Sequence, residues 1–343
     1  MGCWFSRKGQ PVEEEQVEEA PKEYSWDKRK KEDKSKFYVR DVENIENSVC
    51  RNDVKDLPMT IENCKSCIIF LNCLCKEVTI DNCQDMKIIT FASGSVYIRD
   101  SSNVELVTIC GQLRTRDCRS MRLYLHCPTQ PVIETTQKVT TYPLPIDFES
   151  IEEIVSDFGR SKFLNNWADI HDFGPVDHAG EPNWAPGTDV EIALKEVFDE
   201  FNDTFDSSPR LSLERTIFPQ VAYPYPSAAE VKDEMVFALF AGEKSEELAT
   251  NCYYRVTGTL KKAKLIRSTA GKLSPLSLPT RAQKSLQLSE GSQIVILIFE
   301  GQLLATEISS EAEPGCSFFA FGDEARTEYD NFFNTSAFGN HNL

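Results

Sequence analysis

The chain has 343 residues, 41% of them hydrophobic and 27% charged, which is typical of a folded protein with room for two ordinary domains. Its formal net charge of −17 argues against general nucleic-acid binding, because phosphates need a basic face, and favours a basic protein surface as the partner. Twelve cysteines without an apolar secretory leader ahead of them lead us to expect a reducing compartment and free thiols.

Residues 1–6 fit the pattern for N-myristoylation, with Gly2 as the acceptor once Met1 is removed. Cys3, directly beside it, is the expected position of a palmitoyl group. One myristoyl chain gives only marginal membrane binding, and a second acyl chain makes it stable. We therefore predict a lipoprotein that carries myristate and palmitate at a membrane, with residues 1–36 as a flexible polar tether. A chance match to the pattern is the alternative.

A short repeat with a spacing of 17 to 19 residues follows. It is clearest in two columns of small residues, which are Cys64, Cys83, Ser101 and Cys118, and Cys73, Ala92, Cys110 and Cys127. Short β-rich segments at this period predict a right-handed parallel β-helix, in which like residues stack on one another. Cysteine and alanine suit the interior of such a ladder, while asparagine and aspartate suit its turns.

Other interpretations of the repeat stay open. Cys64-x-x-Cys67 followed by Cys73-x-Cys75 has part of the spacing of a zinc site, although the columns continue into residues that cannot bind metal. That continuation favours core cysteines and no metal, and a disulfide is the third possibility. A leucine-rich repeat has a similar period, but its pattern of leucine and asparagine is missing.

The fourth copy of the repeat is unusual, because Thr115 stands where the earlier copies have isoleucine. Side chains alternate along a strand, so Gln112, Arg114 and Arg116 should point to one face, opposite Thr115. A guanidinium held out from a rigid sheet can complete the active site of another protein. The alternative is a solvated face on which Arg116 pairs with a neighbouring carboxylate: Asp100, Asp117 or Glu134.

The chain resembles the tubulin-cofactor-C family, most closely its membrane-anchored members, over roughly residues 1–185. Five blocks in order carry the resemblance: residues 1–3, 24–27, 112–118, 129–134 and 167–173. The family has a parallel β-helix domain, here expected over residues 37–185, and accelerates GTP hydrolysis by Arf-like small GTPases. The resemblance therefore implies GTPase activation and an Arf-like GTPase, in its GTP-bound form, as the partner.

The resemblance also implies roles for single residues. Arg114 would be the arginine finger, Gln112 would lie beside it at the nucleotide, and Arg116 would support the site. Glu134 and Phe173 would belong to the GTPase-binding surface, although packing is the alternative role for Phe173.

The expected protein is a monomer without a cofactor or a nucleotide site of its own. It would act at the cytoplasmic face of the plasma membrane near a cilium, in protein transport of lipidated cargo. A non-catalytic effector or scaffold, and a tubulin-folding cofactor, are the alternative functions.

The second half is predicted to begin with a helix and linker over residues 186–233, whose helix covers residues 189–201. A small α+β domain follows over residues 234–343. It has a helix over residues 245–254 and strands over 236–241, 263–266 and 294–299, with a hairpin strand over 303–308. The resemblance implies a ferredoxin-like, nucleoside-diphosphate-kinase-like domain. That kinase chemistry needs a histidine, and the only histidine after His178 is His341, so we expect the domain to be non-catalytic.

Overall fold

The computed structural model describes residues 34–174, 180–205, 209–214, 216–221, 223–232, 234–273, 280–303, 305–308 and 313–333. The chain divides into residues 1–34 and a compact unit of residues 35–343. The predicted acylation sites Gly2 and Cys3 lie outside the described residues. In the described part of the chain, no helix is both long enough and apolar enough to span a bilayer.

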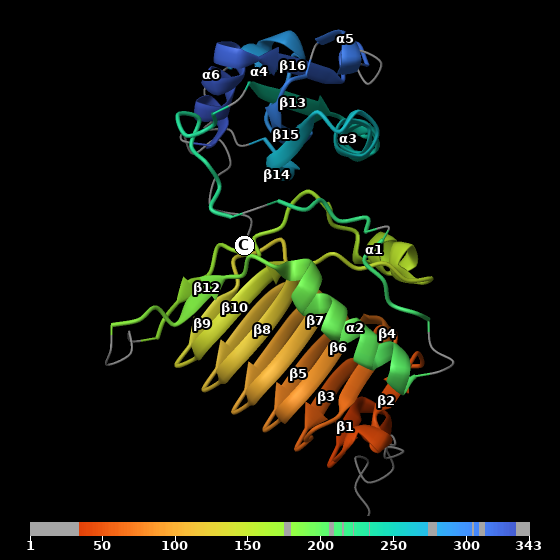
Figure 1. Ribbon diagram of the computed structural model, residues 1–343. Coiled ribbons are helices and arrows are strands. Elements are labelled where there is room, and N and C mark those ends of the chain that lie inside the picture. Colours follow the sequence, from red (N-terminus) through yellow and green to blue (C-terminus); the bar gives the residue numbers. More distant parts are fainter. Residues whose placement is uncertain are drawn as a thin grey trace, which may run out of the picture. The chain divides into compact units, whose positions relative to one another are not determined.

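Within the described residues, twelve strands pair in parallel and wind into a β-solenoid of about six turns (Figure 1). The strands are β1 (Tyr38–Arg40), β2 (Val49–Arg51), β3 (Pro58–Glu62), β4 (Ile68–Cys75), β5 (Glu77–Asp81), β6 (Gln84–Arg99), β7 (Ser102–Arg116), β8 (Arg119–His126), β9 (Val132–Glu134), β10 (Gln137–Pro143), β11 (His171–Asp172) and β12 (Trp184–Pro186). Two short 3-10 helices, η1 (Lys34–Phe37) and η2 (Ile45–Asn47), precede β2. The register pairs Ile61 with Ile80, Ile80 with Ile98, and Ile98 with Thr115, which confirms the predicted repeat and the parallel β-helix.

The coils turn at corners built from left-handed residues. Asp117 and Ser120, three residues apart, have φ angles of 53° and 58°, and equivalent pairs recur in the neighbouring coils. Asparagine and aspartate adopt this conformation at lower cost than other side chains with a Cβ. The corner side chains also stack, since Asn82 donates to Asn63 at 2.8 Å. The predicted use of asparagine and aspartate in the turns is therefore confirmed.

The first cysteine column caps the inside of one corner in each coil. Each hydroxyl or thiol donates to the backbone carbonyl two residues earlier, at 2.6 to 3.3 Å, in the series Cys64, Cys83, Ser101, Cys118 and Thr136. Burial raises the pKa of Cys118 to about 11, which keeps that thiol protonated and able to donate. The cysteines of this column are buried thiols outside any disulfide, and the described residues contain no cluster of three or more metal-binding side chains. The interpretation as core cysteines is confirmed.

The second predicted column is wrong at its first member. Cys75, and not Cys73, pairs with Ala92, because the register between β4 and β6 shifts after Phe70. The segment of β4 that follows Phe70 is therefore longer than the matching segment of β6. The spacing of the repeat in the sequence does not show this irregularity.

Two helices cover part of the solenoid from outside. The helices α1 (Ile151–Phe158) and α2 (Val190–Thr204) pack on the outer surface of β4 and the first halves of β6 and β7 (Figure 1). Both sides of β4 and of the middle of β7 are covered, so their residues are buried almost without interruption. The last five residues of β7 alternate between buried and accessible instead, because among the described residues α1 and α2 pack only on the earlier part of this strand. The predicted helix over residues 189–201 is confirmed as α2.

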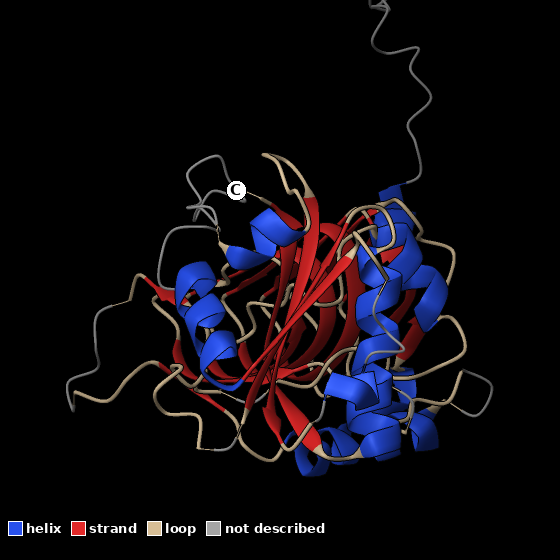
Figure 2. Cartoon of the chain, turned by 90° about the horizontal axis from the view of Figure 1, so that it is seen from above, coloured by secondary structure: helices blue, strands red, loops and turns tan. Residues whose placement is uncertain are grey.

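The carboxyl-terminal part forms an antiparallel four-stranded sheet in the order β14-β15-β13-β16. Its strands are β13 (Met235–Ala241), β14 (Ala263–Lys272), β15 (Gln293–Gly301) and β16 (Ser317–Phe321). Helices pack on both faces of this sheet (Figure 2): α3 (Ser245–Tyr253), the π-helical turn η3 (Tyr254–Leu260), α4 (Arg281–Ser285), α5 (Ala305–Ile308) and α6 (Gly322–Phe333). The predicted α+β class is confirmed, and the likeness to nucleoside diphosphate kinase stays a prediction.

The hairpin strand predicted over residues 303–308 is wrong. Residues 305–308 form the helix α5 instead. Both edges of β15 are already occupied, by β13 on one side and β14 on the other, so no edge remains for a further partner. Leu303 and Ile308 are buried against one face of the sheet, which accounts for their apolar character.

Candidate functional site

The unusual fourth copy of the repeat forms the end of β7. Gln112 and Arg114 reach solvent, Leu113 and Thr115 are buried, and Arg116 is exposed, as the predicted alternation requires. We call the surface formed by Gln112, Arg114 and Arg116, together with the outward residues in register on the adjoining strands, the arginine face. Those residues are Ser95, Tyr97 and Arg99 on β6 and Val132 and Glu134 on β9.

The structure places Gln112, Arg114, Arg116 and Glu134 on this face and the fifth predicted site residue of the β-helix, Phe173, at its edge. Arg116 lies beside Glu134 in the ladder of β7 and β9. The strand β11 pairs with β9, and the backbone N–H of Phe173 donates to the carbonyl of Ile133 at 2.9 Å. Phe173 therefore follows Glu134 at the edge of the sheet, two strands away from β7. Its side chain is 63% exposed, which excludes the packing role that the sequence left open.

The corner after Arg116 fixes the end of the arginine strand. The thiol of Cys118 donates to the carbonyl of Arg116 at 3.1 Å, and the N–H of Asp117 donates to the carbonyl of Glu134 at 3.1 Å. The hydroxyl of Thr135 adds a bond of 2.7 Å to the carboxylate of Asp117. Backbone and corner side chains thus hold β7 to β9 at the point where the arginines are presented.

Beneath the arginines, Thr115 replaces one isoleucine of its column and pairs with the buried Thr136. Thr115 is 2% exposed and its hydroxyl donates to the hydroxyl of Thr136 at 3.1 Å. Thr136 in turn donates to the carbonyl of Glu134 at 2.8 Å. Because a buried hydroxyl needs a partner, Thr115 depends on Thr136, and the pair links β7 to the segment that follows β9.

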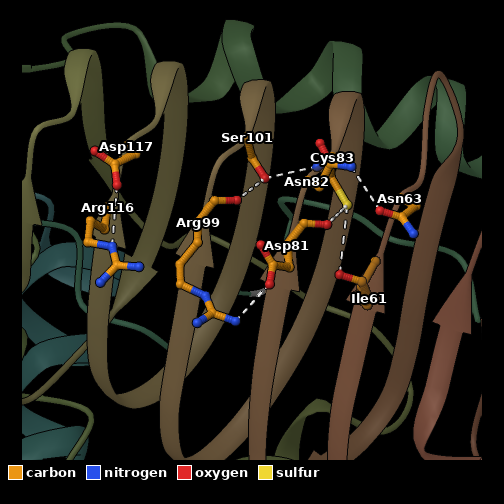
Figure 3. A network of polar contacts seen from close by, with 9 residues as sticks. All are labelled: Ile61, Asn63, Asp81, Asn82, Cys83, Arg99, Ser101, Arg116 and Asp117. Atoms are coloured by element: carbon orange, nitrogen blue, oxygen red, sulfur yellow. Dashed lines mark hydrogen bonds and ion pairs between the residues drawn. The ribbon is translucent and has the colours of Figure 1, made fainter.

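Charged residues in the earlier coils of this face are paired with one another. Arg99 contacts the carboxylate of Asp81 at 2.7 Å (Figure 3), and at the start of the solenoid Arg40 contacts that of Glu62 at 3.1 Å. Such ion pairs between neighbouring strands are typical of a solvent-exposed surface with a purely structural role. They show that the sheet itself neutralises arginines when a carboxylate stands in register.

The pattern changes at β7. Arg116 contacts its sequence neighbour Asp117 at 3.4 Å, with half of each side chain exposed, so the alternative of a pair with a nearby carboxylate is confirmed for Arg116 (Figure 3). An exposed pair of this kind contributes at most about 1 kcal/mol. Among the described residues, by contrast, the side chains of Gln112, Arg114 and Glu134 have no hydrogen-bond or ion-pair partner. An exposed guanidinium, an exposed carboxylate and a half-buried amide are therefore presented together.

Sequence reasoning missed three further residues of this face. Tyr97 and Val132 flank Arg114 in the ladder, and His171 follows Val132 on β11. The ring of His171 lies 4.2 Å from that of Phe173 in an edge-to-face arrangement. Tyr97 occupies the same place in its copy of the repeat as Arg114, so the repeat could have revealed it. His171 could not be placed, because β11 pairs with a strand almost forty residues earlier.

Part of the chain is similar to a known protein family. A family model described as Tubulin binding cofactor C matches residues 56–173, a span that contains Gln112, Arg114, Arg116, Glu134 and Phe173. The chain therefore carries a tubulin binding cofactor C domain. A solved structure described as Tubulin Binding Cofactor C from Leishmania major is 22% identical, with a TM-score of 0.28, over 34% of this chain and 82% of that one.

Among characterised proteins, the chain is similar to those named XRP2. The relative from Xenopus laevis is 35% identical over 192 residues, which are 54% of this chain and 54% of the relative. The relative from Danio rerio is 29% identical over 229 residues, which are 66% of this chain and 60% of the relative. The chain thus spans little more than half the length of the curated relatives that it matches.

Proposed function

We propose that this protein accelerates GTP hydrolysis by an Arf-like small GTPase and supplies Arg114 in trans as the catalytic arginine. The observation that carries the proposal is the exposed Arg114 side chain. Within the described residues it has no partner, although the same face neutralises Arg40 and Arg99 with carboxylates in register. Similarity to the XRP2 proteins is consistent with a small GTPase as partner.

The chemistry requires little more than a positioned cation. Hydrolysis of GTP places negative charge on the oxygens of the γ-phosphoryl group, and a guanidinium can form two parallel hydrogen bonds to them. An arginine supplied in this way accelerates turnover by roughly 10³ to 10⁵, equivalent to about 4–7 kcal/mol. In the proposed complex, Gln112 lies beside Arg114 at the nucleotide, and Arg116 supports the site.

Glu134 and Phe173 serve as contacts to the GTPase in this proposal. Phe173 is the large apolar side chain with which an interface of this kind would be anchored, since a few buried aromatic residues carry most of the binding free energy. The carboxylate of Glu134 is available to a basic group of the partner. The net charge of −17 would speed encounter with a GTPase whose contacting surface is basic.

We further propose that acyl chains on Gly2 and Cys3 hold the protein at the cytoplasmic face of the plasma membrane, near a cilium. There it would promote the traffic of lipidated proteins by returning the GTPase to its GDP-bound form. The reason for two chains is physical, because a single myristoyl group binds membranes only marginally.

The experiment that tests the catalytic proposal uses purified Arf-like GTPases loaded with GTP, each measured with the intact chain and with Arg114→Ala. We expect one or more GTPases to be accelerated by the intact chain and to be bound but not accelerated by the variant. Arg40→Ala is the matched control, because Arg40 lies on the same side of the sheet but four strands from β7. Tight binding without acceleration by the intact chain would contradict the proposal and leave an effector or scaffold.

The tubulin-folding alternative rests on a shorter similarity. The protein named Tubulin-folding cofactor C from Arabidopsis thaliana is 32% identical over 92 residues, 27% of this chain. The same GTPase panel, with tubulin dimers added as a further substrate, separates the two functions. Acceleration confined to tubulin would favour the alternative.

A further inference from the structure

Phe173 is an exposed aromatic side chain at the very edge of the solenoid. It directly follows β11, a strand of two residues that pairs with β9 alone among the described strands. An aromatic anchor at such an edge is useful to a partner only if it is already held in position, because ordering it on binding would subtract from the affinity. The surroundings of Phe173 show how it is held.

Two backbone hydrogen bonds attach the segment to the sheet. The N–H of His171 donates to the carbonyl of Pro131 at 2.8 Å, and the N–H of Phe173 donates to that of Ile133 at 2.9 Å. The ring of His171 supports the ring of Phe173 from the side, with the centroids 4.2 Å apart. Among the described residues, the backbone hydrogen bonds between this segment and the chain around β9 end at Phe173, and a side chain fixes the turn that follows.

Asp172 supplies that side chain. It pairs with Ile133 in the ladder, so a carboxylate takes the inward position that isoleucine holds in earlier coils. One of its oxygens, Oδ1, accepts from the N–H of Gly174 at 2.7 Å. The other, Oδ2, accepts from the side-chain amide of Asn183 at 2.9 Å. A carboxylate with both oxygens bound in this way ties together two segments separated by eleven residues.

We call the hydrogen-bonded pair of Asp172 and Asn183 the clamp. Its second residue is anchored deep in the solenoid. Asn183 is 3% exposed, and its backbone carbonyl accepts from the N–H of Val139 at 2.9 Å, immediately before β12 joins β10. Gly174 fits tightly between the two partners, because a Cβ atom there would lie 3.0 Å from Asp172 Oδ1 and 3.1 Å from Asn183 Nδ2.

We propose that Asp172 and Asn183 are positioning residues that hold Phe173 ready for the GTPase. They touch neither nucleotide nor partner, and they act through the backbone on either side of Phe173. The inference rests on the proposed function for the identity of the partner, and on the contacts of this clamp for the mechanism. Loss of the clamp should therefore weaken association with the GTPase and leave the rate of hydrolysis within the complex unchanged.

The test compares four variants with the intact chain. Asp172→Ala removes the clamp. Asn183→Asp sets two carboxylates against each other. The double variant Asp172→Asn/Asn183→Asp restores one donor and one acceptor in exchanged positions, and so controls for loss of folding. Asp169→Ala is the matched control. Asp169 lies on the same stretch of chain as Asp172, but its carboxylate accepts from the side-chain amide of Gln130 and not from the residues around Phe173.

Single-turnover hydrolysis is measured against the concentration of each variant. Asp172→Ala and Asn183→Asp should raise the half-saturating concentration about tenfold and leave the maximal rate within about twofold, as expected for an anchor that must be ordered on binding. The double exchange and Asp169→Ala should behave as the intact chain. In a Phe173→Ala background, Asp172→Ala should add no further loss. A lower maximal rate, an additive loss or a failed rescue would overturn the inference.

Amide hydrogen exchange of Phe173 in the free protein separates failure of this inference from failure of the proposed function. Asp172→Ala should make that amide exchange at least about tenfold faster, since opening of the edge strand is then less costly. If no GTPase is accelerated by the intact chain, the proposed function fails while this measurement still decides whether the clamp holds Phe173. Unchanged exchange overturns the clamp whatever the GTPase does.

Discussion

The two buried threonines beneath the arginine face give a prediction whose size follows from the geometry. Thr136→Val removes the hydroxyl that receives the hydrogen bond of Thr115 and that donates to the carbonyl of Glu134. In the ladder Thr115 stands between isoleucines, at Ile98 and Ile133, so its hydroxyl would be left buried without a partner. An unsatisfied buried hydroxyl costs about 1–3 kcal/mol, and we expect Thr136→Val to lower the free energy of unfolding by about 2 kcal/mol.

Removal of the other hydroxyl, that of Thr115, should lower the free energy of unfolding much less. Thr115→Val removes one hydrogen bond, worth about 1 kcal/mol, but places a methyl group in the isoleucine column, which returns about 0.8 kcal/mol. Thr136 keeps its bond to the carbonyl of Glu134 in that variant. The double variant should cost only about 1 kcal/mol, because no hydroxyl is then left without a partner.

Equilibrium unfolding in urea, followed by far-ultraviolet circular dichroism, measures all three variants. Thr79→Val is the matched control, because Thr79 lies on the outer side of β5, and its effect should stay within about 0.5 kcal/mol. If the cost of the double variant equals the sum of the two single costs within about 0.5 kcal/mol, the two hydroxyls do not depend on each other and the reasoning is refuted.

Three further predictions concern other parts of the chain. Gly111→Ala should destabilise the protein by about 1–3 kcal/mol in urea unfolding, because a Cβ there would lie 2.8 Å and 2.9 Å from the carbonyl oxygens of Ser93 and Gly94; an unchanged midpoint would contradict this. Burial lowers the pKa of His126 to about 3 from an ordinary value near 6.5, so the folded state binds fewer protons and stability should fall as the pH drops from about 6.5 towards 3. His126→Phe should make that decline less steep by up to about 1.4 kcal/mol per pH unit. If the intact chain and the variant lose stability with falling pH at the same rate, His126 does not cause the decline. Gly2→Ala should abolish incorporation of a labelled myristate in cells and release the protein from membranes, and label retained by the variant would count against N-myristoylation.

Much of the solenoid could be predicted because its signals are local and repeated. The spacing from Cys64 to Cys118 reports a register that every coil shares, and the alternation around Arg114 follows from one strand alone. The shift after Phe70 could not be predicted, because it is an irregularity in a single coil.

The rest of the site depends on contacts that are distant in the sequence. Glu134 and Phe173 were both assigned to the partner-binding surface only through the family resemblance. The strand before Phe173 pairs across a gap of almost forty residues, and the clamp of Asp172 needs Asn183, eleven residues later. No periodicity connects such residues. The same limit explains the failed strand at residues 303–308, where the apolar pattern was correct but β15 had no free edge.

The central claim is that Arg114 acts in catalysis and not merely in binding. The most direct test is the maximal single-turnover rate of GTP hydrolysis at saturating concentrations of the intact chain, Arg114→Lys and Arg114→Ala, with the affinity for the GTP-bound partner measured in parallel. Lysine keeps the charge but not the planar fork, so both variants should lose most of an acceleration of about 10³ or more while the affinity changes little. A maximal rate that survives in either variant would contradict the account.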